Sequence, residues 1–193
     1  MSKLIIIGAG GHGRVIADST DMPIVFLDDN KSSENIVGAF IDIDSMQEKS
    51  DMVIVAIGNN TARIKLLDGL TNVATVVHPT AVVSNSASVG AGTVIFANAV
   101  VNACANVGRG CIINTAATVD HDCILEDGVH ISPGAHLGGN VVVGSLSWIG
   151  IGASVKHGIT IGKNVIVGAG AVVVHDVSDG KTVVGVPAKE PKK

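Results

Sequence analysis

Residues 119–144 read VDHDCILEDGVHISPGAHLGGNVVVG, and they belong to a six-residue repeat that extends from Val83 to Val173. Helices repeat apolar residues every three to four positions and amphipathic strands every second position, so a period of six fits neither. It is typical of a parallel β-helix built from hexapeptides. Every sixth residue is an aliphatic one: Val83, Val89, Ile95, Val101, Val107, Ile113, Val119, Leu125, Ile131, Leu137, Val143, Ile149, Val155, Ile161, Val167 and Val173.

Two further positions of the hexad carry information. The fourth residue after each aliphatic is usually small, as at Ala117 and Cys123, and is predicted to be a second inward residue. The residue directly after each aliphatic is often Gly or a short polar residue, which predicts corners with unusual backbone angles. Three hexads are expected to close one triangular coil, so residues eighteen apart should stack. The repeats then make roughly five coils and a prism about 25 Å tall.

Composition limits the class of protein. Hydrophobic residues make up 47% of the 193 residues, which is ample for a core, whereas aromatic residues make up 2% and the net charge is −4. The last two values argue against a nucleic-acid-binding protein. Leu4–Ile7 is too short for a signal peptide, and no stretch is long enough to cross a membrane. Three cysteines without a CxxC motif, two of them at inward positions (Cys111 and Cys123), suggest core thiols and a cytoplasmic location.

The N-terminal part lacks the hexad repeat and predicts a compact βαβ unit with parallel strands. Its expected strands are 3–7, 24–27 and 52–57, and its expected helices are 14–20 and 61–70. His78-Pro79 is read as the link to the repeats, because the residue before a proline favours an extended backbone. The predicted domains are therefore residues 1–75 and residues 76–193.

Gly8-Ala9-Gly10-Gly11-His12-Gly13 matches the GxGxxG motif, and Asp28 follows twenty residues after Gly8, where a ribose-binding acid would lie. A dinucleotide fold needs two such halves, and about 75 residues are too few for both. A single half suits one nucleotide, with the diphosphate on the amides at the helix start and an Asp on the base or ribose. The alternative is that the glycines only form a tight turn.

His121 lies two positions after Val119, in an outward slot, between Asp120 and Asp122. Neighbouring carboxylates raise the basicity of an imidazole, and amide formation needs a group that removes a proton from the attacking amine. We therefore predict His121 as a general base. Gly139 lies eighteen residues later on the same face, where its N–H is predicted to stabilise the oxyanion of a tetrahedral intermediate.

Two other chemistries compete with this interpretation of the site. His121, Asp122 and His130 include metal-ligand types, but their spacing matches no recognised metal site, and direct acyl transfer needs no metal. No metal cofactor is expected. Covalent catalysis through Cys123 is disfavoured, since that side chain is predicted to point into the prism.

The hexad repeat, Gly10–Gly13, Phe26–Asp29, Ile57–Asn60, His121–Cys123, Gly138–Val141 and Gly185–Lys189 together resemble the bacterial nucleotide-sugar acetyltransferases with a left-handed β-helix. The resemblance covers nearly the whole chain. It is nearest to the N-acetyltransferases of bacillosamine biosynthesis, which acetylate the 4-amino group of a UDP-linked dideoxy sugar. Sialic acid O-acetyltransferases and perosamine N-acetyltransferases are similar.

The resemblance implies a homotrimer with acetyl-CoA in a groove between neighbouring prisms. Asp122 would orient His121, although the bacillosamine enzymes often have Glu there. His130, which falls halfway between His121 and Gly139, would help to place the acetyl group or the sugar, and Asn114, near the same face as His121, would contact the sugar. The nucleotide would contact Gly10, His12, Asp28, Asp29, Gly58 and Asn59. CoA would pass Ile151, Gly152, Gly168 and Gly170, with its phosphates near Lys189 and other basic residues of the C-terminal part.

The expected function is acetyl-CoA-dependent N-acetylation of a UDP-linked 4-amino-4,6-dideoxy sugar, with no nucleic acid partner and no membrane insertion. The alternatives are a sialic acid O-acetyltransferase, a GDP-perosamine N-acetyltransferase, or a non-catalytic nucleotide-sugar-binding or trimeric scaffold protein.

Overall fold

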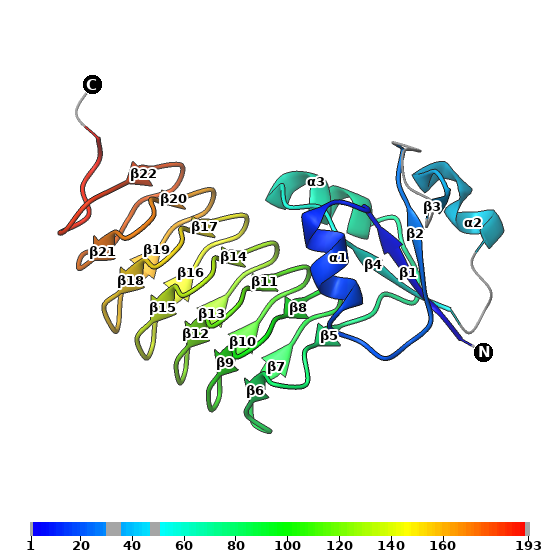
Figure 1. The fold of residues 1–193 in the computed structure, drawn as a ribbon. Coiled ribbons are helices and arrows are strands. Elements are labelled where there is room, and N and C mark those ends of the chain that lie inside the picture. The colour runs from blue at the N-terminus through cyan, green and yellow to red at the C-terminus, as the bar shows by residue number, and fades with distance from the viewer. Residues whose placement is uncertain (1, 30–35, 47–50, 192–193) are drawn as a thin grey trace.

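The computed structural model describes residues 2–29, 36–46 and 51–191. An N-terminal α/β unit adjoins a three-sided prism of parallel strands, whose coils advance away from that unit along the chain (Figure 1). The predicted fold class, a small α/β domain followed by a parallel β-helix, is confirmed. No helix in the described ranges is long and apolar enough to span a bilayer.

The N-terminal unit is a four-stranded parallel sheet in the order β3-β2-β1-β4. The three predicted strands and two predicted helices are present, but the first helix begins at Gly11, inside the glycine motif and three residues before its predicted start. A short edge strand, a 3-10 helix and a four-residue helix were missed, because each is too short to show a periodic pattern. The elements are β1 Leu4–Ile7, α1 Gly11–Ala17, β2 Ile24–Leu27, β3 Ile36–Gly38, η1 Phe40–Asp42, α2 Ile43–Met46, β4 Met52–Val55 and α3 Asn60–Leu67.

The prism has one sheet on each side, and every strand is two residues long. The seven-stranded sheet contains β5 Val76–Val77, β8 Val94–Ile95, β11 Ile112–Ile113, β14 His130–Ile131, β17 Trp148–Ile149, β20 Ile166–Val167 and β22 Thr182–Val183. The six-stranded sheet contains β6 Val82–Val83, β9 Val100–Val101, β12 Thr118–Val119, β15 His136–Leu137, β18 Ser154–Val155 and β21 Val172–Val173. The five-stranded sheet contains β7 Ser88–Val89, β10 Asn106–Val107, β13 Ile124–Leu125, β16 Val142–Val143 and β19 Thr160–Ile161.

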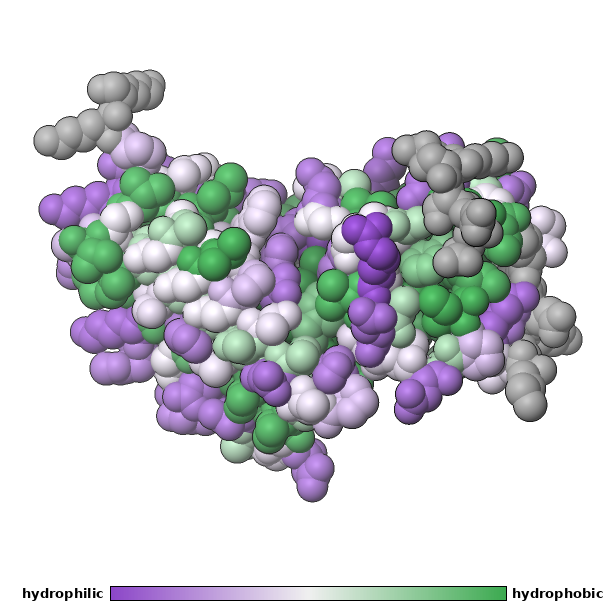
Figure 2. All heavy atoms as spheres, in the orientation of Figure 1, coloured by the Kyte–Doolittle hydropathy of each residue, from purple (hydrophilic) through white to green (hydrophobic). Residues whose placement is uncertain are grey.

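The predicted eighteen-residue register is confirmed, since Asn106 pairs with Ile124 and His130 with Trp148. From β6 to β21, the second residue of each strand is the hexad aliphatic, and it points inward, as at Val119 and Ile131, which are fully buried. The small fourth residue also points inward, and Cys123 is fully buried. The first residue points outward, so apolar and polar side chains are interspersed over the visible face (Figure 2).

The predicted reason for the corner glycines is wrong. Left-handed backbone angles occur at the third residue after the aliphatic, for example at Asn98, Asp122 and Asn140, with φ between 58° and 59°. The glycines directly after the aliphatic meet a different constraint, because a Cβ on Gly144 would lie 2.6 Å from the main chain of the next coil. Their role is close stacking of coils rather than an unusual φ.

The prism continues beyond Val173, where the hexad repeat in the sequence ends. Val177 is buried and forms a bridge with Ile161, and β22 extends the seven-stranded sheet by pairing with β20. The intervals from Val173 to Val177 and from Val177 to Val183 are four and six residues, so this last turn falls out of the hexad period. The end of the chain then folds back, with the Ala188 N–H donating to the Val172 carbonyl at 2.8 Å.

A buried arginine joins the two parts. Arg63, on α3, has 1% of its surface exposed. Each of its five N–H donors reaches an acceptor, and none of these acceptors in the described ranges is a carboxylate. Burial lowers the pKa of Arg63 to about 10. The acceptors are the carbonyls of Gly110 (2.7 Å), Ile57 (3.0 Å), Gly58 (3.2 Å) and Gly128 (3.0 Å) and the side-chain oxygen of Asn60 (2.8 Å).

The third glycine of the N-terminal motif, Gly13, lets α1 lie close to the turn after β1. A Cβ on Gly13 would overlap the carbonyl oxygen of Gly8, whereas a Cβ on Gly11 would find only the flexible end of Arg14, at 3.9 Å. Helix propensity alone favours Ala at both positions. Replacement by alanine is therefore expected to destabilise the protein at Gly13 but not at Gly11.

We expect Gly13→Ala to lower the free energy of unfolding by about 3 kcal/mol, because the helix must move off the sheet to admit the methyl group. Gly11→Ala, on the same helix, should leave it unchanged or raise it by up to about 1 kcal/mol. Urea denaturation of both variants, followed by circular dichroism, measures the difference. Equal stability of the two variants would contradict the close packing of α1.

Candidate active site

His121 lies in the corner between β12 and β13, where its side chain is 54% exposed. Its Nδ1 is 2.8 Å from Oδ2 of Asp122. Asp120 accepts hydrogen bonds from the His121 N–H and from Asn102 Nδ2, both at 2.8 Å, and so stabilises the corner. The hydrogen bond to Asp122, followed by the charge of Asp120, raises the pKa of His121. Nε2 is left as the nitrogen that can accept a proton.

Gly139 lies directly against this imidazole, one coil further along. A Cβ at this position would be 2.5 Å from Nε2 of His121, so any side chain would displace the ring. The adjacent Asn140 N–H donates to the His121 carbonyl at 2.9 Å, which holds the two corners together. No acceptor for the Gly139 N–H is found among the described residues. A cavity of about 560 Å³, also lined by Lys156 and His157, opens in front of the pair.

The glycine-rich turn of the N-terminal unit has one part that packs against the rest of the chain and one part that faces open space. Gly8 has a φ of +109° and packs against the main chain of Ala56. The Ala9 N–H donates to Oδ2 of Asp28 at 2.7 Å, so this carboxylate supports the turn. A Cβ on Gly10 would meet no atom within 4 Å. The backbone at Gly10 therefore faces open space, and no contact within the described chain explains why this residue is a glycine.

The other predicted nucleotide contacts lie at the same edge of the sheet. Asp29 Oδ1 accepts from the Phe40 N–H at 3.1 Å, and both acids at the end of β2, Asp28 and Asp29, line a cavity of about 140 Å³. Gly58 also faces open space. Asn59 caps α3, because its side-chain oxygen accepts from the Ala62 N–H at 2.9 Å.

His12 and His130 come from different domains and are brought together at the junction. The ring of His12 contacts Phe96 edge to face at 5.4 Å, and its buried Nε2 has no partner among the described residues. Burial, followed by the charge of Arg63, lowers the pKa of His12 to about 4. The same two causes, with His12 third, lower the pKa of His130 to about 3. Both rings are therefore neutral near pH 7.

The tautomer of His130 follows from its neighbours. Asn114 Nδ2 lies 3.1 Å from Nε2 of His130 and donates to it, so the ring proton belongs on Nδ1. This Nδ1 is buried and has no acceptor in the part of the chain that the structure describes. Trp148 stacks on the ring, with centroids 5.4 Å apart.

The expectation that Asn114 lies near the same face as His121 is wrong within one chain. Asn114 follows β11 and His130 lies on β14, both in the seven-stranded sheet, whereas His121 lies between the six-stranded and five-stranded sheets. Asn114 and His121 are seven residues apart, which is more than one hexad, so the chain has turned a corner between them. The N-terminal unit packs on the side of Asn114, with Leu4 and Ile6 in one cluster with residues of the seven-stranded sheet.

The predicted CoA contacts lie at the corner between the seven-stranded and six-stranded sheets. Ile151 is 62% exposed, and Gly152 and Gly170 have φ of +65° with open space around them. Gly168 packs against Val184, since a Cβ would lie 2.7 Å from it. Lys189 lies in the end segment, which pairs with Val184. CoA binding by these residues stays a prediction.

Sequence reasoning missed Arg63 and Trp148. Arg63 gives no sequence signal, because a single Arg in a predicted helix is usually exposed. Trp148 had a signal, being the only Trp in the chain. It lines a groove of about 210 Å³ at the domain junction, together with Gly58 and Asn59.

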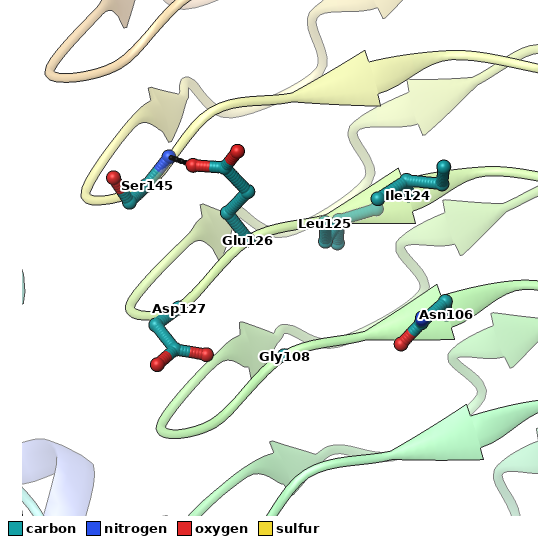
Figure 3. A pocket seen from close by; sticks show the side chains of 7 residues that line it. All are labelled: Asn106, Gly108, Ile124, Leu125, Glu126, Asp127 and Ser145. Atoms are coloured by element: carbon teal, nitrogen blue, oxygen red, sulfur yellow. Dashed lines mark hydrogen bonds between the residues drawn. The ribbon is translucent and has the colours of Figure 1, made fainter.

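A larger groove, of about 410 Å³, lies at the corner between the five-stranded and seven-stranded sheets (Figure 3). Its carboxylates are occupied in stacking the coils, since Glu126 accepts from the Ser145 N–H at 3.0 Å and Asp127 from the Arg109 N–H at 2.8 Å. No group of three or more His, Cys, Asp or Glu that could hold a metal ion was found within the described ranges.

A hexapeptide prism with an outward His–carboxylate pair against a glycine defines an acyltransferase-like protein. Two family models match the chain: the PglD N-terminal domain over residues 3–70 and the bacterial transferase hexapeptide (six repeats) over residues 140–175. UDP-N-acetylbacillosamine N-acetyltransferase from Bacillus subtilis (strain 168) is 38% identical over 108 residues. That match spans 48% of this chain and 50% of the length of the relative.

Several solved structures match over nearly the full length. The acetyltransferase domain of PglB from Neisseria gonorrhoeae FA1090 is 43% identical, with a TM-score of 0.93, covering 99% of this chain and 100% of that one. It has also been solved with acetyl coenzyme A. A variant of perosamine N-acetyltransferase from Caulobacter crescentus, in complex with CoA and GDP-perosamine, is 35% identical, with a TM-score of 0.95 and coverage of 100% and 98%. The chain belongs to the bacterial nucleotide-sugar acetyltransferases with a left-handed β-helix.

We expect Asp122→Asn to lower the pKa of His121, because the substitution removes the carboxylate that raises it most. NMR titration of the imidazole measures this directly. The midpoint of the imidazole titration should therefore move to lower pH. Asp127→Asn, at another corner of the prism, is the control and should leave the titration unchanged. An unaltered pKa in Asp122→Asn would contradict the assigned contact.

Proposed function

We propose that this chain transfers the acetyl group of acetyl-CoA to the 4-amino group of a UDP-linked 4-amino-4,6-dideoxy sugar, with His121 as the general base. The observation that carries the proposal is the exposed His121 imidazole, paired with Asp122 through Nδ1 and lying against Gly139. A raised pKa makes Nε2 a better proton acceptor near neutral pH.

In the proposed reaction, the amine nitrogen bonds to the thioester carbonyl carbon while Nε2 of His121 accepts its proton. The carbonyl oxygen becomes an oxyanion, which the Gly139 N–H stabilises by a hydrogen bond. When the intermediate collapses, the carbon–sulfur bond breaks and the imidazolium gives its proton to the CoA thiolate. Asp122 accepts from Nδ1–H throughout and so keeps Nε2 available. The products are an amide and CoA.

The nucleotide is assigned to the open edge of the N-terminal sheet. Gly10 and Gly58 have room for a ligand against their main chains, which suits a diphosphate that hydrogen-bonds to backbone amides. Asp28 and Asp29 line the neighbouring cavity and are assigned to the base or ribose. His12, with a neutral ring near the prism, is assigned to the sugar side of the same ligand.

Acetyl-CoA is assigned to the corner that holds Ile151, Gly152 and Gly170. Open glycines and an exposed aliphatic side chain suit the pantetheine arm, which is extended and largely apolar. Gly168 and Lys189 continue this corner toward the end of the prism, where the CoA phosphates would find basic residues.

A second copy of the chain is needed to complete the site. The nucleotide domain, His130 and Asn114 lie on the side of the seven-stranded sheet, whereas His121 and Gly139 lie across the prism. An amino sugar held on the side of the seven-stranded sheet is therefore assigned to the His121 of a neighbouring chain. This supports a homotrimer in which each site is shared by two neighbouring copies.

The choice of UDP over GDP rests on one relative, the UDP-N-acetylbacillosamine enzyme, which is 38% identical over 108 residues. The perosamine enzyme, 35% identical over the full chain, keeps GDP as the alternative that the assay below distinguishes. The three cysteines are free thiols, which suits the reducing cytoplasm that we propose as the location.

A thiol-release assay with acetyl-CoA tests the substrate assignment. We expect rapid turnover of a UDP-4-amino-4,6-dideoxy sugar and slow or no turnover of GDP-perosamine and free sialic acid. Turnover of GDP-perosamine alone would support the mechanism but show that the nucleotide is GDP and not UDP. Turnover of sialic acid alone would overturn the role of the N-terminal domain, and turnover of none would favour the scaffold protein.

We expect His121→Ala to lower kcat by about 10²- to 10⁴-fold, the usual contribution of a general base, with little change in substrate affinity. The assay above measures kcat, and calorimetry measures affinity. His175→Ala, an exposed histidine near the end of the prism, serves as the control and should retain normal kcat. Unchanged turnover in His121→Ala would exclude the proposed mechanism.

Mixed trimers test the shared site. His121→Ala chains and Asp28→Asn/Asp29→Asn chains should each be inactive alone, whereas mixed trimers should recover about a third of the wild-type rate, because one of three sites then combines two intact halves. Differently tagged chains are refolded together, isolated by both tags and assayed. Mixed trimers without activity would show that each chain uses its own His121.

A further inference from the structure

Trp148 occupies an unusual position for the only tryptophan of the chain. It is the outward residue of β17, next to His130 on β14 in the register of the seven-stranded sheet. Its surface is 46% exposed, so it is neither a core residue nor a fully solvated one. Its register neighbour on β20, Ile166, is 48% exposed, so the two side chains form an apolar patch, and such patches mark contacts with something outside the chain.

One face of the indole is fixed by the protein. It lies nearly parallel to the His130 ring, with an interplanar angle of 11° and centroids 5.4 Å apart. Its Nε1–H donates to Oγ of the buried Ser132 at 2.6 Å. Since Asn114 also holds His130 by a hydrogen bond, the imidazole is clamped between the amide and the indole. The indole therefore helps to determine the direction in which Nδ1 of His130 points.

The exposed part of the indole lines the groove between the two domains. The groove holds Gly58 and Asn59 on one wall, from the turn before α3, and Trp148 and Ile166 on the other. Its width is fixed by Asn60, whose Nδ2 donates to the carbonyls of Leu146 (3.0 Å) and Ser147 (3.3 Å). The groove thus joins the open backbone at Gly58 to the aromatic wall of the prism.

We propose that Trp148 is a recognition and positioning residue for the nucleotide-linked amino sugar. Its exposed part forms the prism wall against which the nucleoside diphosphate sugar packs, and its stacked face positions His130. This inference rests on the proposed function and extends it by assigning part of the nucleotide-sugar affinity to the prism. An indole suits this role, since it presents a broad apolar surface to a planar base or to the apolar face of a sugar.

Because Trp148 is the only tryptophan and the chain has no tyrosine, its fluorescence reports on this groove alone. The first experiment titrates the full chain with UDP and with GDP, each separately, and follows intrinsic tryptophan fluorescence. We expect a saturable change with at least one of the two nucleotides. Calorimetry in the same buffer measures binding independently, and binding without any change in fluorescence would overturn the proposal.

The second experiment separates affinity from turnover. Trp148→Ala should raise the KM of the nucleotide sugar about tenfold, which corresponds to the loss of one stacking contact, and leave the KM of acetyl-CoA unchanged. Trp148→Phe, which keeps a flat ring, should recover most of this loss. Ile41→Ala removes another large exposed apolar side chain, 86% exposed on the N-terminal unit, and should change neither constant.

The outcomes also distinguish this proposal from the function itself. If the wild-type chain acetylates no amino sugar, the proposed function falls, while the fluorescence response to nucleotides still decides whether Trp148 forms the wall. If the wild-type chain is active and Trp148→Ala has an unchanged KM for the nucleotide sugar, the proposal about Trp148 is wrong. Circular dichroism of Trp148→Phe verifies that the comparison is made between folded proteins.

Discussion

The backbone hydrogen bonds between successive coils are the constraint on which the rest of this molecule depends. Each coil donates to the next in a constant register, as from the Asn106 N–H to the Cys123 carbonyl at 2.8 Å. Residues eighteen positions apart are thereby stacked within one strand spacing of each other. This stacking places Gly139 under His121 and Trp148 beside His130. The chemistry of the prism is therefore assembled by short contacts between coils, on a scaffold whose strands cannot shift independently.

The second constraint is the way in which the N-terminal unit is held on this scaffold. Arg63 is buried, has no carboxylate partner among the described residues and donates to carbonyls of both domains. A buried guanidinium satisfied by neutral oxygen acceptors demands well-placed donors, since the loss of any hydrogen bond would leave a buried charge poorly solvated. The turn that carries Gly58 is therefore fixed relative to Trp148, and the groove between them has a defined width.

These two constraints explain why the histidines of the candidate site lie in two different environments. The neutral histidines at the junction, His12 and His130, lie in a desolvated environment where burial lowers their pKa values. His121 lies at an exposed corner where carboxylates raise its pKa. One chain thus carries hydrogen-bonding imidazoles on one side and a basic imidazole on another. Such a separation of roles suits a reaction in which one group positions the substrate and another accepts its proton.

The sequence alone determined the prism, its eighteen-residue register, the inward Cys123 and the outward His121 above Gly139. It could do so because a β-helix repeats every hexad, so covalent spacing maps directly onto position. Only the tertiary structure decided the roles of Arg63 and Trp148, the meeting of His12 with Phe96, and the separation of Asn114 from His121. The contacts of Arg63 with Gly110 and Gly128 join residues 47 and 65 positions apart. Contacts of this kind follow from how two different domains pack, and no period in the sequence encodes them.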